Sequence, residues 1–156
     1  MKPTEVHIVQ LRAMRVASAY GFGEQPEQLA WQQLSAWARP RGLLNDPGVH
    51  PLYGFNNPYP TPDSPRYGYE FWIKVGAECE PADKIRIVEF MGGSYATMRC
   101  EIAGHPESIP EGWQILARWC QEHGHKIGKH TALEEFIGTP DDLASLVLIL
   151  YCPIVE

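Results

Sequence analysis

The chain has 156 residues, 44% of them hydrophobic and 21% charged, which is the composition of an ordinary globular domain. Its formal net charge of −6 argues against nucleic acid as a direct partner, because proteins that bind phosphate backbones usually carry a basic patch. The longest apolar run, 146–151, is far shorter than the roughly 20 residues of a membrane span, and no secretory signal precedes it. Four scattered cysteines are typical of reduced thiols. We therefore expect a cytoplasmic protein with no membrane contact.

The first half of the chain predicts two short strands, then a helix, then two more strands. β-Branched residues indicate strands at 5–11 and 14–20, and Pro26 is placed to open a helix that ends before Pro40. A strand is expected at 49–55, followed by a proline-rich loop. The clearest strand is 66–75, where alternation places Glu70 and Trp72 on one face and Phe71 on the other.

The second half predicts the same order of elements. Strands are expected at 84–90 and 94–101, with a turn at 91–93 between them. A helix starts near Pro106 and Pro110 and runs to about His123. Two further strands are expected at 131–137 and 144–154. Each half is therefore β-β-α-β-β, and the short joins between strands favour an antiparallel α+β fold.

A repeated motif supports an internal duplication. The pattern W-Q-x-L-x-x-W occurs at 31–37 and at 113–119, and a glycine follows each copy five residues later, at Gly42 and Gly124. The offset is 82 residues for both the motif and the glycine. We expect one domain, 1–156, built of two repeats at about 4–76 and 84–156. The repeats would be related by a pseudo-twofold axis, with both main helices on one face of the sheet.

Glu134 is the residue in the sequence that most needs an explanation. It lies in an apolar strand, where an unpaired carboxylate is costly to bury. Alternation places Glu134 beside Phe136, and the adjacent Glu135 would then face the other side. A carboxylate among aromatic rings is suited to a flat cationic ligand. The aromatic candidates are Tyr53, Phe55, Trp72, Tyr95 and Tyr151, although core packing is the alternative for any single one.

Other chemistry has little support in the sequence. His123, His125 and His130 lack a suitably spaced cysteine or carboxylate, so we expect no metal site. The Gly92-Gly93 pair is not followed by the lysine of a phosphate-binding loop, and no cofactor is expected.

The order of several motifs resembles the GyrI-like small-molecule-binding family. This is the effector-binding domain found at the C-terminus of many AraC- and MerR-type transcription activators. The matching stretches are 66–70, 92–96, the helix motif at 113–119, 133–136 and 150–154. Together they span nearly the whole chain.

The resemblance implies a pocket at the seam of the two repeats, with Glu134 as its floor and aromatic walls. The family's E-x-Y motif has Phe136 in place of its tyrosine here, so a hydroxyl contact would be missing. Trp72 and Tyr151 occupy corresponding places in the two repeats, and Tyr53 corresponds to Glu134. No DNA-binding segment precedes the domain, so we expect a stand-alone member.

Three functions are compatible with this resemblance. The first is a binding module for aromatic, neutral or cationic small molecules, in sensing or sequestration linked to transcription regulation or drug resistance. The second is a hydrolase of strained electrophilic toxins, with Glu134 as the base and Tyr95 or Tyr151 as a hydroxyl donor. The third is a protein-interaction inhibitor, such as a gyrase modulator, with a regulator or gyrase as partner.

Overall fold

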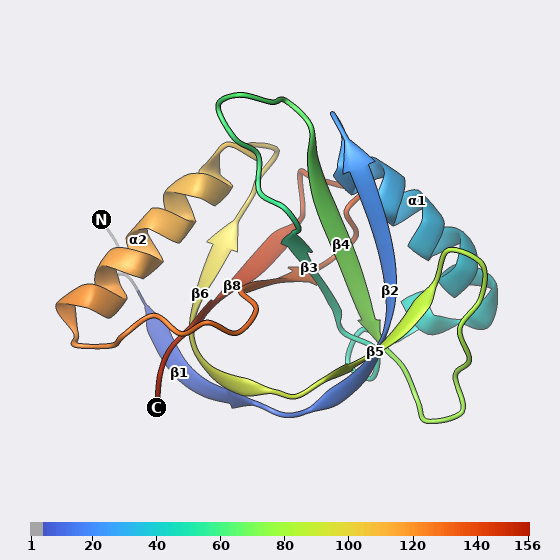
Figure 1. Ribbon diagram of the computed structural model, residues 1–156, viewed down its shortest axis with the longest axis horizontal. Coiled ribbons are helices and arrows are strands. Elements are labelled where there is room, and N and C mark those ends of the chain that lie inside the picture. The colour runs from blue at the N-terminus through green and yellow to red at the C-terminus, as the bar shows by residue number, and fades with distance from the viewer. Residues whose placement is uncertain (1–4) are drawn as a thin grey trace. The chain divides into compact units, whose positions relative to one another are not determined.

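A computed structural model describes residues 5–156; the first four residues, where the first repeat is predicted to begin, lie outside the described part. The elements follow the predicted β-β-α-β-β order in each half (Figure 1). They are β1 (Val6–Leu11), β2 (Met14–Gly23), α1 (Pro26–Ala38), β3 (Leu52–Asn56), β4 (Tyr67–Lys74), β5 (Arg86–Phe90), β6 (Gly93–Glu101), α2 (Ser108–Glu122), β7 (Leu133–Ile137) and β8 (Val147–Pro153), with two short 3-10 helices, η1 (Arg39–Arg41) and η2 (Leu43–Asn45). The predicted antiparallel α+β class is confirmed.

The chain forms two compact units whose limits differ from those of the sequence repeats. The central unit comprises residues 14–90, and the terminal unit joins 5–13 to 91–156. In the central unit β5 pairs antiparallel with β2, and in the terminal unit β1 pairs antiparallel with β6. Each unit therefore takes one strand from the opposite sequence repeat and completes a four-stranded sheet with it.

This exchange corrects the predicted turn at 91–93. The two strands that flank it do not pair with each other, because β5 belongs to the central unit and β6 to the terminal one. Gly93 already belongs to β6, and Gly92 has a φ of 83°. A Cβ on Gly92 would lie 2.5 Å from the carbonyl oxygen of Leu11, so close backbone approach explains the glycine.

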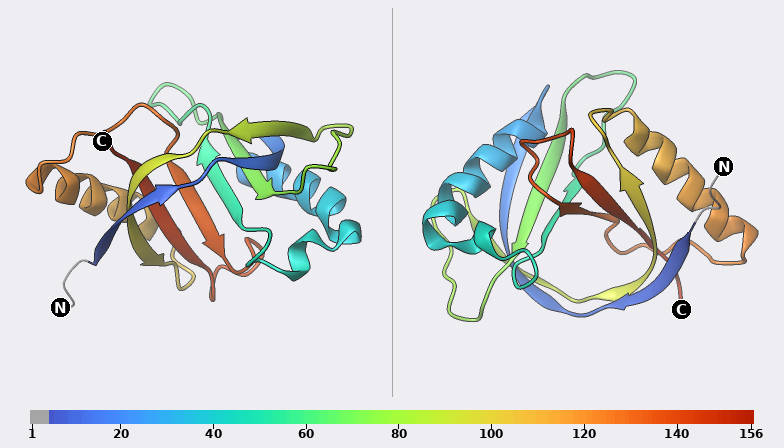
Figure 2. Two further views of the ribbon diagram at one scale, coloured as in Figure 1. Left: turned by 90° about the horizontal axis from the view of Figure 1, so that it is seen from below. Right: turned by 180° about the vertical axis from the view of Figure 1, so that it is seen from behind.

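The central sheet has the strand order β3-β4-β2-β5, and α1 packs on one of its faces (Figure 2). The ring of Trp31 lies 5.6 Å from that of Phe71, which shows that Phe71 faces the helix. Ala17 and Ile73 are fully buried and directly opposite each other on the neighbouring strands. Glu70 and Trp72 consequently lie on the face opposite α1, as the alternation of β4 predicts.

The terminal sheet has the order β1-β6-β8-β7, and α2 packs against β6 and β8. The core on this side includes Leu116 and Cys120 of α2 with Leu148, Leu150 and Cys152 of β8. Since side chains alternate along a strand, Ile149 and Tyr151 lie on the face opposite α2. None of the helices in residues 5–156 is long and apolar enough to cross a membrane.

A buried carboxylate beside a cleft

Three of the predicted ligand residues come together on the face of the central sheet opposite α1. The register pairs Tyr53 with Trp72 and Phe55 with Glu70, so these four side chains share one face. The rings of Phe55 and Trp72 meet edge to face with their centroids 4.8 Å apart. The carboxylate that accompanies these aromatics is that of Glu70.

Two more predicted residues, Tyr95 and Tyr151, lie on the face of the terminal sheet opposite α2. Their rings are 5.6 Å apart in an edge-to-face arrangement. The hydroxyl of Tyr151 donates to Oε1 of Glu135 at 2.7 Å, and that of Tyr95 donates to the carbonyl of Thr131 at 2.6 Å. Burial raises the pKa of Tyr95 well above its usual range, so this hydroxyl keeps its proton.

Glu134 and Phe136 lie on the other face, against α2. The register pairs Glu134 with Leu150 and Phe136 with Leu148, and both leucines belong to the core beneath the helix. The indole nitrogen of Trp113, in α2, donates to Oε2 of Glu134 at 3.1 Å. Glu134 and the two tyrosines thus lie on opposite faces of one sheet, and a role for Glu134 in ligand binding stays a prediction.

Glu70 is the centre of a polar network. Its Oε2 accepts hydrogen bonds from Ser18 Oγ at 2.6 Å and Trp72 Nε1 at 2.7 Å. Arg86 Nη2 lies 3.4 Å from the same oxygen, and Asn57 Nδ2 lies 3.5 Å from Oε1. Pairing of β2 with β4 and β5 produces this cluster, because Ser18 is directly opposite both Trp72 and Arg86. The Glu70 side chain is only 5% exposed, against 69% for that of Arg86.

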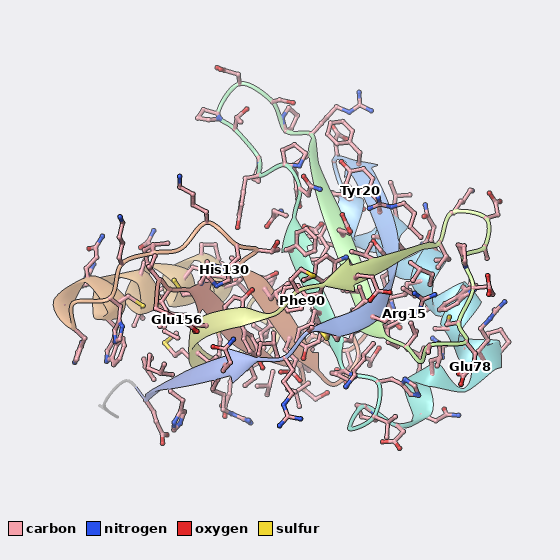
Figure 3. The ribbon with its side chains drawn as sticks, turned by 60° about the horizontal axis from the view of Figure 1, so that its bottom comes forward. Arg15, Tyr20, Glu78, Phe90, His130 and Glu156 are labelled. Atoms are coloured by element: carbon pink, nitrogen blue, oxygen red, sulfur yellow. The ribbon has the colours of Figure 1, made fainter. Side chains whose placement is uncertain are left out.

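A cleft of about 600 Å³ opens beside this carboxylate. Pairing of β5 with β2 stops at Ser18, so β2 continues to Tyr20 without that neighbour. Figure 3 shows Tyr20 toward the end of β2 that lies away from Arg15. The cleft is lined by Ser18, Tyr20, Gln33, Asn57, Glu70, Ala82, Lys84, Ile85 and Arg86. Its volume is in the range of small-molecule sites.

A second cleft of about 580 Å³ lies in the same unit, near the end of α1. Its walls include Trp37 and Arg41, and the Arg41 guanidinium lies 4.7 Å above the Trp37 ring. The carboxylates that reach it, those of Glu78 and Glu80, are on an exposed loop. It therefore lacks the buried charge that marks the Glu70 cleft. Within residues 5–156 no group of three or more side chains could hold a metal ion.

The sequence prediction missed Glu70, Ser18, Asn57 and Arg86 as candidate site residues. One signal was available, because alternation along β4 already places Glu70 on the same face as Trp72. The contribution of Arg86 had no local signal, since it depends on a strand from the other repeat.

The fold and this site together define a small antiparallel α+β domain with a polar cleft in one unit. The model of the GyrI-like small molecule binding domain matches residues 4–155, so the chain belongs to this family. No curated protein matches it. Solved structures with this fold include a hydrolase from Listeria innocua (12% identity, 97% of this chain and 92% of that chain covered, TM-score 0.70) and the EcmrR C-terminal domain (12%, 98% of each chain, TM-score 0.71). The structure of SAV2435 bound to tetraphenylphosphonium is also similar (14% identity, 97% of this chain and 94% of that chain covered, TM-score 0.55).

Proposed function

We propose that this protein binds cationic, partly apolar small molecules and that Glu70 provides the counter-charge. One observation carries the proposal: a carboxylate is buried on the wall of a cleft of about 600 Å³, and within residues 5–156 its Oε1 has only the 3.5 Å contact to the Asn57 amide. Such binding would serve sensing or sequestration of the compound. A relative of the same fold is described as bound to tetraphenylphosphonium, and another, EcmrR, as part of a complex with DNA.

The Glu70 carboxylate favours a cation at its own oxygens, although the cationic side chains of Lys84 and Arg86 also line the cleft. A buried carboxylate is costly unless it is paired and fully hydrogen-bonded. The guanidinium of Arg86 compensates this charge incompletely, because it is mostly exposed and its nearest nitrogen is 3.4 Å from Oε2. A bound cation would complete the pairing. Ile85, Ala82 and the ring of Tyr20 supply apolar contact for the rest of the ligand.

The test compares two buried glutamates by isothermal titration with arylalkyl cations. Glu70→Gln keeps the size of the side chain and removes the charge, and we expect it to lower affinity at least tenfold, since hydrogen bonds to charged groups contribute about 1.5–3 kcal/mol. Glu134→Gln is the matched control, because Glu134 is likewise buried and accepts an indole N–H. We expect its affinity to stay within about twofold of wild type.

The other outcomes are equally informative. Loss of binding in Glu134→Gln with retention in Glu70→Gln would move the charge to Glu134, the residue that the sequence predicts. Absence of binding for every cation, with both variants folded, would reject the binding function.

A further inference from the structure

The two oxygens of the Glu70 carboxylate are bonded very differently. Oε2 accepts from Ser18 and Trp72 at 2.6 and 2.7 Å and has Arg86 at 3.4 Å. Oε1 has one contact within the described part of the chain, the amide of Asn57 at 3.5 Å. An ionised carboxylate can accept about four hydrogen bonds in all. The unfilled capacity is therefore concentrated on one oxygen of a side chain that lines the cleft.

The aromatic rings near Glu70 pack against one another. The Trp72 ring meets Phe55 edge to face at 4.8 Å and lies 5.7 Å from Phe90, while its N–H is used by Glu70. Tyr20 is the aromatic residue that lines the cleft, and its hydroxyl is held by the carbonyl of Asn57 at 2.8 Å. Quaternary cations are typically bound in cages of several aromatic faces. This cleft offers a hydrogen-bond acceptor in place of such a cage.

Arg86 already brings a donor-bearing cation to this carboxylate. Its guanidinium reaches Glu70 from the edge strand β5. The Arg86 side chain is mostly exposed and the contact is long, so this ion pair is weak. Arg86 therefore neutralises the Glu70 charge only in part, and it competes weakly with a cation that binds at Oε1. Lys84 also lines the cleft, but no contact between Lys84 and Glu70 is found among the described residues.

We propose that the Glu70 cleft selects cations that carry N–H donors, such as primary ammonium or guanidinium groups, and that Arg86, which contacts the other carboxylate oxygen, competes with the ligand for the charge of Glu70. This inference rests on the proposed function of cation binding at Glu70. It adds the chemical class of the ligand and a residue that competes with it.

The experiment uses a matched pair of probes, 2-phenylethylammonium and its N,N,N-trimethyl analogue, titrated calorimetrically into the full chain. The two differ in their N–H donors and in the three methyl groups that replace them. We expect the primary ammonium to bind at least tenfold more tightly, and we expect Glu70→Gln to remove this preference. Arg86→Met should raise the affinity for the primary ammonium by about threefold to tenfold, because the competing cation is gone.

Two variants separate competition from general charge. Lys84→Met removes one positive charge from the same cleft and should raise affinity less than Arg86→Met. Arg86→Lys keeps a donor-bearing cation and should behave like wild type. Urea unfolding of each variant checks that the exposed substitutions leave the fold intact.

Equal affinity of both probes would overturn the donor preference, while a loss of both in Glu70→Gln would leave the proposed function in place. Weaker binding in Arg86→Met would overturn the competing role of Arg86. If neither probe bound to wild type or to Arg86→Met, the proposed function would fail together with the inference.

Discussion

The two units each bury one glutamate that accepts a hydrogen bond from a tryptophan, yet the two residues differ in surroundings. Glu70 in β4 is 4% exposed and Glu134 in β7 is 8% exposed. The indole that donates to Glu70 is on the same strand, whereas the indole that donates to Glu134 is on the helix α2. Glu70 faces away from its helix and borders a cleft, while Glu134 faces its helix. Burial and the type of hydrogen-bond partner therefore do not distinguish the two carboxylates, whereas the face of the sheet on which each lies does.

The sharpest contrast concerns the two indoles, and it predicts the largest effect on stability. Trp72 is fixed between Phe55 and Phe90 and donates at 2.7 Å, whereas Trp113 is partly exposed and donates at 3.1 Å. Trp72→Phe removes a donor from a buried charge and leaves a cavity, so we expect a loss of about 2–4 kcal/mol in the free energy of unfolding. Trp113→Phe should cost about 1 kcal/mol, because water can replace the donor there. Urea unfolding monitored by circular dichroism measures both.

A double-mutant cycle isolates the hydrogen bond from the cavity. In a Glu70→Leu background, Trp72→Phe should lose only the packing part of its cost. Equal losses for Trp72→Phe and Trp113→Phe in the wild-type background would erase the contrast between the two carboxylates.

Local patterns in the sequence predicted the local features of this fold. The order of the elements, the two faces of β4 and the glycines after each helix all follow from periodicity and backbone preference. The exchange of β1 and β5 between the units did not follow, since strand pairing over long sequence distances leaves no local signal. The contact between Arg86 and Glu70 depends on that exchange.

The strand that contains Glu134 shows a second reason for the limits of sequence reasoning. Leu133–Ile137 has apolar residues at both of its ends and two adjacent glutamates, so alternation fixes that they face opposite sides but not which one faces the helix. The register with β8 decides it, by pairing Glu134 with Leu150. Resemblance to a family motif could identify a carboxylate, but not its side of the sheet.

Three buried thiols of the terminal unit make the stability of the protein depend on pH in the alkaline range. Burial raises the pKa of Cys152, in the terminal unit, to about 12, with the nearby Cys120 adding to the shift. Burial also raises the pKa values of Cys100 and Cys120. A thiol that holds its proton more tightly in the folded chain contributes stability that is present below pH 9 and lost as the pH rises from about 9 toward 12.

We therefore expect the free energy of unfolding to fall above pH 9, by up to about 1.4 kcal/mol per pH unit for each such thiol. Cys152→Ala should flatten this slope. Urea unfolding between pH 8 and 11 gives both slopes, and an unchanged slope in Cys152→Ala would contradict the expectation.

The smallest expected effect on stability concerns the two glycines that follow the repeated helix motif, one in each unit. Gly42 follows α1 and η1 with a φ of 73°, and Gly124 follows α2 with a φ of 76°. Neither position is crowded: a Cβ on Gly42 would lie 3.7 Å from its nearest neighbour, and one on Gly124 would have none within 4 Å. Only the left-handed backbone then opposes a side chain, so Gly42→Ala and Gly124→Ala should each cost about 1 kcal/mol.

Gly48→Ala is the control for this pair, because Gly48 lies in a loop of the central unit without a left-handed φ. It should change the free energy of unfolding by less than about 0.5 kcal/mol in urea titrations. Equal costs at Gly42 and Gly124 would mean that the two helices end in the same backbone conformation, although the buried carboxylates of the two units lie on different faces relative to these helices. A cost at Gly124 alone would mean that η1, which separates α1 from Gly42, has taken over that role in the central unit.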